Sequence, residues 1–163
     1  MTVSLDLNVR RKLWPEAAAA SVLRALAARV DIVLGGIDEV ALVTRRGVSA
    51  DPGALAAAAL DLGPATAILK LGADGALGME RGGSPVVAPA LPVTVVDPIG
   101  AGDAFTAGFI SARMDDAPLG RALAVANACG AAAVAAVGDM SGLPTRDELE
   151  RLLGGSSLGD TIR

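Results

Sequence analysis

Apolar and polar residues alternate over residues 3–9, and this period of two predicts a β-strand. Two short apolar runs, residues 31–34 and 65–71, predict further strands, the first of which ends at a Gly-Gly pair. Three helical stretches fall between and beside these runs, at residues 15–29, 38–44 and 51–62, with Pro15 suited to a first helical position and Asp51 to an N-cap. Strands and helices therefore alternate along the first half of the chain.

Residues 72–96 interrupt this alternation. A glycine-containing turn leads into three strand-like runs, at residues 76–80, 85–88 and 93–96, which indicates an antiparallel hairpin. Two long helices are predicted next, at residues 101–114 and 119–137, and a capping box from Thr145 to Glu148 precedes a last helix at 149–153. The order of elements predicts the α/β class, with a mostly parallel sheet flanked by helices.

Composition narrows the class of protein. The chain has 163 residues, of which 52% are hydrophobic and 20% charged, so we expect one globular domain over residues 1–153 and a flexible tail over residues 154–163. A net charge of −4 and an aromatic content of 2% argue against nucleic-acid binding, which needs basic and stacking surfaces. We expect neither a signal peptide nor a membrane span.

The absence of histidine excludes Ser-His-Asp and Cys-His catalysis and the usual zinc sites. Cys129 is the single cysteine, so no internal disulfide is possible. It lies in an apolar run, which predicts a buried core thiol and fits a reducing, cytoplasmic location.

Candidate chemistry is concentrated in the run Asp97-Pro-Ile-Gly-Ala-Gly-Asp103. A Gly-Ala-Gly turn that enters a helix presents backbone N–H groups and the positive end of the helix, which together form an anion hole. A carboxylate directly after such a turn would repel a bound phosphate, but it has a use if Asp103 accepts a proton from an attacking hydroxyl. From the residues alone a second interpretation stays open, in which Asp103 only caps the helix and the glycines form an ordinary turn.

Other phosphate-binding motifs do not match. The chain has no Gly-x-x-x-x-Gly-Lys-Ser/Thr sequence and no protein-kinase motifs. The dinucleotide fingerprint needs a third glycine where this chain has Phe105.

The run from Asp97 to Phe105, followed by Ala107-Gly-Phe109, closely resembles the C-terminal signature of the ribokinase-like (PfkB family) sugar kinases. The resemblance extends from Ser4 to about Leu153 and corresponds to the second half of a typical family member. It implies a ribokinase-like fold that is incomplete here, because the N-terminal half and the lid have no counterpart in this sequence.

The resemblance also implies roles for individual residues. Asp103 would be the catalytic base, and the backbone of Gly100, Ala101 and Gly102 would form the anion hole. Lys70, Gly72 and Gly75 match the family's Lys-x-Gly-x-x-Gly turn beside the nucleotide, although the two glycines could simply close a hairpin.

Three further positions match the family near the nucleotide. Asn127 corresponds to an asparagine that lines the adenine pocket, although a satisfied polar core residue is equally compatible with its apolar helix. Asp97 and the region of Gly138 correspond to a loop that binds a monovalent cation such as K⁺, although Asp97 could cap the turn without touching a cation.

A second motif bears on the sugar. The run Asp6-x-Asn-x-Arg10-x-x-Leu-Trp14 resembles one shared by 2-keto-3-deoxygluconate kinases and fructokinases. Arg10 would suit the carboxylate of a sugar acid, because its planar guanidinium binds carboxylates bidentately, unless it is only a solvated charge at the end of a strand. Asp139, in a loop more like that of the ketodeoxygluconate kinases, would reach a sugar hydroxyl or be an ordinary loop acid.

One position departs from the family pattern. Many members carry Asn-x-x-Glu near the phosphate and Mg²⁺, and this chain has Gly36-x-x-Glu39 instead. Glu39 could still act through Mg²⁺-bound water without the asparagine.

The sequence thus predicts ATP- and Mg²⁺-dependent phosphorylation of a sugar or sugar acid, of the 2-keto-3-deoxygluconate kinase type, with fructose as the alternative substrate. Two other hypotheses remain: a truncated, non-catalytic nucleotide-binding module, and a generic α/β domain without a ligand. The first strand would form an exposed sheet edge through which chains could self-associate.

Overall fold

The computed structural model describes residues 1–154, and these residues form two compact units. The first unit contains Met1–Gly72 and Ala76–Val87, and the second contains Ala73–Gly75 and the chain from Ala88 onward. Residues 155–163, which make up all but the first residue of the predicted tail, lie outside the described part. No helix within residues 1–154 has both the length and the apolar character needed to cross a membrane.

The sheet is mixed, and its strands follow one another in chain order: β1 (Ser4–Asp6), β2 (Ile32–Gly36), β3 (Thr66–Lys70), β4 (Ala76–Glu80) and β5 (Val86–Ala88). β1, β2 and β3 are parallel, and β4 returns antiparallel to β3. The structure therefore confirms both the α/β class and the hairpin predicted after Gly72. β1 is the terminal strand of this order.

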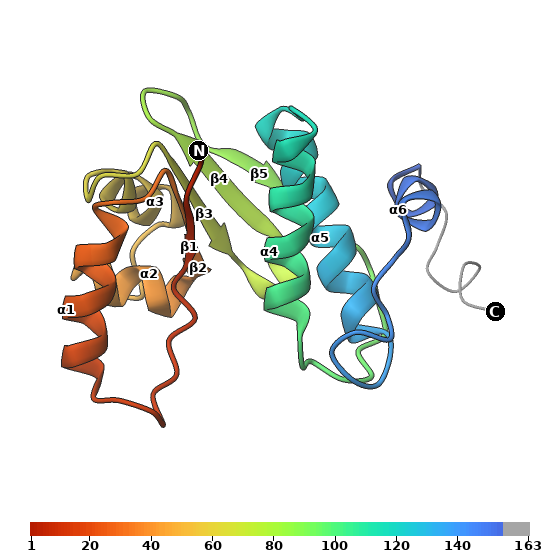
Figure 1. Cartoon of the computed structure of the whole chain (residues 1–163), viewed down its shortest axis with the longest axis horizontal. Coiled ribbons are helices and arrows are strands. Elements are labelled where there is room, and N and C mark those ends of the chain that lie inside the picture. The colour runs from red at the N-terminus through yellow and green to blue at the C-terminus, as the bar shows by residue number, and fades with distance from the viewer. Residues whose placement is uncertain (155–163) are drawn as a thin grey trace. The chain divides into compact units, whose positions relative to one another are not determined.

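Three helices cover one face of the parallel strands in the first unit: α1 (Glu16–Ala27), α2 (Ile37–Thr44) and α3 (Pro52–Leu60) (Figure 1). Their buried side chains pack on strand residues that alternate onto the same face, among them Val33, Ala67 and Leu69. Asp51 caps α3 by accepting a hydrogen bond from the N–H of Ala54 at 3.0 Å, as predicted.

The second unit is helical: α4 (Ala101–Met114), α5 (Leu119–Val134) and α6 (Arg146–Leu153). α4 and α5 pack closely at Gly108, where a Cβ atom would lie 2.7 Å from the Sγ of Cys129. Cys129 is buried, as predicted for a core thiol, and this burial raises the pKa of the thiol.

Two predictions of secondary structure in this unit are wrong. Residues 93–96 form no strand, because the N–H groups of Val96 and Asp97 donate to the carbonyl of Val134, at 2.8 and 3.2 Å, instead of to a neighbouring strand. α6 begins at Arg146 rather than at 149, because Thr145 is its N-cap and Glu148 is already its third residue. Gly154, the first residue of the predicted tail, is the C-cap of α6.

The turn between β3 and β4 consists of the 3₁₀ helix η1 (Gly72–Asp74) and Gly75. Gly75 has a φ of 95°, and a Cβ atom there would lie 2.2 Å from the carbonyl oxygen of Ala88. Both the backbone conformation and the close approach of a second backbone segment therefore require glycine at this position.

We predict that Gly75→Ala destabilises the protein more than Gly82→Ala does. Gly82 also has a positive φ, 79°, but nothing lies within 4 Å of its added Cβ atom. The Gly82 variant should lose about 1–2 kcal/mol from backbone strain alone, and the Gly75 variant a further 1–3 kcal/mol or so from the steric clash. Thermal unfolding of both variants measures the difference, and equal losses would contradict the close approach.

Candidate functional site

The predicted anion hole lies at the start of α4. Gly100 is the N-cap residue, in a left-handed conformation with φ 81° and ψ −11°, and Ala101 and Gly102 begin the helix. The N–H groups of a first helical turn point out of the helix N-terminus, where the helix dipole is positive. Asp103 lies in this first turn and is exposed, so its carboxylate is accessible beside the turn.

Asp97 connects this turn to the loop after α5. One carboxylate oxygen of Asp97 accepts a hydrogen bond from the N–H of Ile99 at 3.0 Å, and the other accepts one from the N–H of Gly138 at 3.1 Å. These two donors hold the pKa of the Asp97 carboxyl below its usual value. The structure therefore brings together Asp97 and Gly138, the two residues predicted for a cation loop.

Gly100 and Asp139 meet at the same place. A Cβ atom on Gly100 would lie 2.9 Å from the Cα and Cβ of Asp139, and the positive φ of Gly100 also disfavours any other residue. Asp139 is exposed. Four of the predicted site residues of the second unit thus lie together, with Asp103 one helical turn further along α4.

Asn127, predicted for an adenine pocket, is buried in α5. Its side-chain amide nitrogen donates to the carbonyl oxygens of Ala88 and Pro89 at 2.9 and 3.0 Å. These are the hydrogen bonds of a satisfied polar core residue, and they fix the chain that leaves β5. A contact between Asn127 and a nucleotide stays a prediction.

The first unit carries polar groups at the carboxyl ends of its parallel strands. Lys70 ends β3, in register with Gly36 at the end of β2, and its ammonium forms a partly buried ion pair with the carboxylate of Asp6 at the end of β1. The ion pair spans the intervening strand. Ligands of open parallel sheets bind beyond this edge, so the position of Lys70 fits the predicted nucleotide contact. The pairing of Lys70 with Asp6 was not predicted from the sequence.

Gly72 follows Lys70 after one residue, with a φ of 61° and nothing within 4 Å of an added Cβ atom. Its backbone is therefore open to the surroundings. At Gly75, by contrast, the space that a Cβ atom would need is occupied by the backbone of Ala88. The packing of the turn therefore explains why this residue is glycine.

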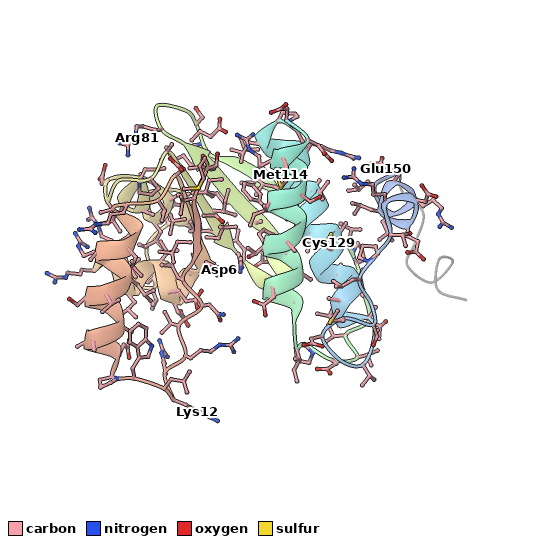
Figure 2. The ribbon with its side chains drawn as sticks, viewed as in Figure 1. Asp6, Lys12, Arg81, Met114, Cys129 and Glu150 are labelled. Carbon is pink, nitrogen blue, oxygen red and sulfur yellow. The ribbon has the colours of Figure 1, made fainter. Side chains whose placement is uncertain are left out.

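Arg10 is exposed in the loop between β1 and α1. Two residues earlier, Asn8 has a φ of 37°, in a region of backbone space that asparagine tolerates better than most residues. Lys12 projects from the far end of this loop (Figure 2), and Arg11 pairs with Glu16 at 3.7 Å. Arg10, Arg11 and Lys12 are all exposed in this loop, and a contact between Arg10 and a sugar stays a prediction.

Glu39 lies in the first turn of α2. Its carboxylate accepts hydrogen bonds from two backbone N–H groups, that of Gly36 at 2.8 Å and that of Val9 at 2.6 Å. Within residues 1–154, no group of three or more acidic, histidine or cysteine side chains is placed to hold a metal ion. Mg²⁺ in kinases is held largely by substrate phosphates and water with one or two carboxylates, so the donors present fit an ion that arrives with a nucleotide.

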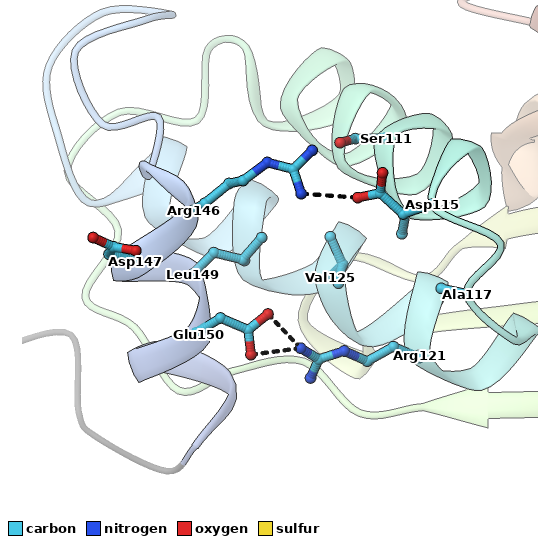
Figure 3. Close-up of a pocket in the computed structure, with 10 residues that line it drawn as sticks. Ser111, Asp115, Ala117, Arg121, Val125, Arg146, Asp147, Leu149 and Glu150 are labelled. Carbon is cyan, nitrogen blue, oxygen red and sulfur yellow. Dashed lines mark hydrogen bonds and ion pairs between the residues drawn. The ribbon is translucent and has the colours of Figure 1, made fainter.

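A groove that the sequence did not indicate lies at the other end of α4 (Figure 3). It has a volume of about 320 Å³ and an apolar floor that includes Val125 and Leu149. Two ion pairs border it: Arg121 with Glu150 at 2.7 Å, and Arg146 with Asp115 at 2.9 Å. None of the predicted site residues lines it.

Comparison with known proteins identifies the family. The model of the pfkB family carbohydrate kinases matches residues 1–146, which is most of the chain. The chain therefore belongs to the pfkB family of carbohydrate kinases.

Individual relatives differ in their substrates. The chain is 38% identical over 154 residues to the 2-dehydro-3-deoxygluconokinase of Bacillus subtilis, covering 93% of this chain and 46% of that protein. It is 33% identical over 155 residues to a fructokinase of Escherichia coli, covering 91% of this chain and 50% of that protein. The chain thus spans about half the length of the curated relatives it matches.

A solved structure shows the same fold. A protein of E. coli described as ribokinase II, in complex with ATP and Mg²⁺, superposes with a TM-score of 0.83 at 31% identity. The match covers 94% of this chain and 48% of the other. The ribokinase-like fold predicted from the sequence is therefore confirmed.

We predict that the bond between Asp97 and Gly138 is lost in acid. Because the folded pKa of Asp97 is lowered, the stabilisation is fully present above the ordinary aspartate pKa of about 4 and disappears as the pH falls through the folded value. The amide signals of Ile99 and Gly138 in a pH titration by NMR should move together, with a midpoint below that of an ordinary aspartate. Asp97→Asn should abolish the step, and a midpoint at or above about 4 would contradict the assignment.

Proposed function

We propose that this protein phosphorylates a sugar or sugar acid with ATP. The observation that carries the proposal is the exposed carboxylate of Asp103, in the first turn of α4 directly after the left-handed turn at Gly100. In this proposal the N–H groups of the turn form the anion hole and the neighbouring carboxylate is the proton acceptor, and membership of a carbohydrate kinase family supports this chemistry.

In the proposed reaction, Asp103 accepts the proton of a sugar hydroxyl while the hydroxyl oxygen bonds to the γ-phosphorus of ATP. The bond from that phosphorus to the bridging oxygen breaks, and ADP leaves with the electron pair. Backbone N–H groups at the start of α4 and the helix dipole stabilise charge on the transferring phosphoryl oxygens. Lys70, Gly72 and Gly75 would lie beside the nucleotide and Asn127 at its adenine.

Two ions complete the proposal. Mg²⁺ offsets the charge of the phosphates, and Glu39 is the residue of the first unit that the family pattern assigns to it. A monovalent cation such as K⁺ would be held near Asp97 and Gly138, which the structure joins by a hydrogen bond. The E. coli protein described as ribokinase II was solved with ATP and Mg²⁺, which supports the nucleotide and the divalent ion.

For the substrate we propose 2-keto-3-deoxygluconate, with Arg10 bound to its carboxylate and Asp139 to a hydroxyl. A guanidinium can bind a carboxylate through two parallel hydrogen bonds, and fructose has no carboxylate to offer. Fructose remains the alternative substrate, since a fructokinase is also a relative. A cytoplasmic location is part of the proposal, because the single thiol, Cys129, suits a reducing compartment.

A second candidate function is a non-catalytic nucleotide-binding module that associates with another chain. The observation that favours it is the position of β1 as the terminal strand of the sheet within the described residues. A terminal strand can pair with a further strand from a second copy of the chain.

We predict that Asp103→Asn lowers kcat/KM about 10²–10⁴-fold while ATP binding is retained, because only the proton acceptor is lost. The assay is ADP release with 2-keto-3-deoxygluconate or fructose in the presence of Mg²⁺. Asp147→Asn is the matched control, since Asp147 occupies the first turn of α6 as Asp103 does that of α4.

Three outcomes separate the candidates. Full activity of the Asp103 variant would show that the base assignment is wrong. Nucleotide binding by the unaltered chain without turnover of either sugar would favour the non-catalytic module. Turnover of fructose but not of the sugar acid would reject the role proposed for Arg10.

We further predict that Ser4→Pro weakens self-association through β1. The N–H of Leu7 donates to the carbonyl of Leu34 in β2, so by strand alternation the N–H of Ser4 faces away from β2. Proline removes that outward donor and leaves the ladder to β2 intact. Sedimentation velocity over a range of concentrations should show less dimer than for Ser4→Ala, and equal amounts would exclude β1 as the interface.

A further inference from the structure

One carboxylate in the first unit connects two segments that are thirty residues apart. Glu39 Oε2 accepts a hydrogen bond from the N–H of Gly36, the N-cap residue of α2, which is the half of a capping box that a glycine N-cap allows. Glu39 Oε1 accepts a second one from the N–H of Val9, in the loop after β1. The second bond is no part of helix capping, because Val9 belongs to a different element.

Because Gly35 has no side chain, there is space beside it for the carboxylate of Glu39. A Cβ atom on Gly35 would lie 2.8 Å from Leu7 Cδ1 and 3.3 Å from Glu39 Oε2. A Cβ atom on Gly36 would meet the carboxylate only at 3.6 Å, an ordinary contact. Gly35 is therefore the glycine on which the arrangement depends, and Gly36 is not.

The bond to Val9 lies at the point where the loop changes direction. The ladder between β1 and β2 continues to the bond from Leu7 N–H to the Leu34 carbonyl, at 2.9 Å. The next residue, Asn8, turns the chain with its φ of 37°. Val9 is then held by Glu39, and Arg10 follows directly.

The bond is of a strong kind. A carboxylate that accepts from an N–H is a charge-assisted acceptor, and such hydrogen bonds are shorter and roughly twice as strong as neutral ones. The distance of 2.6 Å and the partial burial of Glu39 agree with this. A fixed backbone at Val9 limits the directions in which the side chain of Arg10 can leave the loop.

We propose that Glu39 is a positioning residue: it holds the backbone of Val9, and thereby fixes the direction of Arg10 for the carboxylate of a sugar acid. The substrate part rests on the proposed function. This role acts through the loop after β1 and is separate from the contact to Mg²⁺ proposed above for the same carboxylate.

The test is Glu39→Gln in the full chain. Glutamine keeps the shape of glutamate but loses its charge and replaces one of the two accepting oxygens with an NH₂ donor, so the pair of bonds through Oε1 and Oε2 cannot be kept. The amide of Val9 should exchange with solvent about tenfold faster or more, as measured by NMR, since a charge-assisted bond is lost. Fluorescence of Trp14, the single tryptophan and a partly buried neighbour of this loop, should change as well.

The matched control is Glu148→Gln. Glu148 forms the capping box of α6, accepting from the N–H and the hydroxyl of Thr145 at 2.8 and 2.7 Å, and these bonds stay within one helix cap. This variant should leave Val9 exchange unchanged. Glu39→Asp retains the charge but shortens the reach, and it should behave like the glutamine variant if the contact with Val9 is what matters.

Binding of 2-keto-3-deoxygluconate, measured by calorimetry, tests the substrate part. The dissociation constant for the sugar acid should rise about tenfold in Glu39→Gln. Unchanged exchange at Val9, or a shift in the Mg²⁺ dependence of ATP binding without a shift in sugar affinity, would overturn the proposal. If the unaltered chain does not bind the sugar acid, the proposed substrate fails, and Val9 exchange alone decides whether Glu39 holds the loop.

Discussion

The hydrogen bond between Asp97 and the N–H of Gly138 is the contact on which the candidate site of the second unit depends. It joins the loop before α4 to the loop after α5, and Gly100 packs directly on Asp139, the residue next to Gly138. The N–H groups of Val96 and Asp97 also hold the loop before α4, because both donate to the carbonyl of Val134 at the end of α5. The site is therefore held by one carboxylate between two loops and by these backbone bonds to the last turn of α5.

The first unit uses the same device at Glu39. In both units an acidic side chain accepts from its own local turn and from a distant backbone N–H: Ile99 and Gly138 for Asp97, Gly36 and Val9 for Glu39. A carboxylate suits this purpose because it has two oxygens and no donor of its own. Both residues carry metal roles in the family pattern, and a backbone role is compatible with a further contact to a cation, since each oxygen has more than one lone pair.

Much of the fold could be predicted from periodicity, and the exceptions share a cause. The bounds of α4 were predicted correctly because a Gly-rich start and an apolar helical period agree there. Residues 93–96 have the alternating pattern of a strand, yet the backbone N–H groups of Val96 and Asp97 donate to a carbonyl in the last turn of α5. Asn127 is a similar case, since the partners of its amide, Ala88 and Pro89, are almost forty residues away. The local sequence pattern cannot show which distant group will form a hydrogen bond with a given backbone N–H or carbonyl.

The sequence by itself determined the α/β class, the family, and the run that contains Gly100 and Asp103, because these follow from local spacing. The tertiary structure alone decided the partners: Asp6 for Lys70, Gly138 for Asp97 and Val9 for Glu39. It also showed which glycines are required by their own backbone conformation and which by the close approach of another residue. Such pairings join residues far apart in the chain, and the folded path of the backbone, rather than the order of residues, brings their atoms within hydrogen-bonding distance.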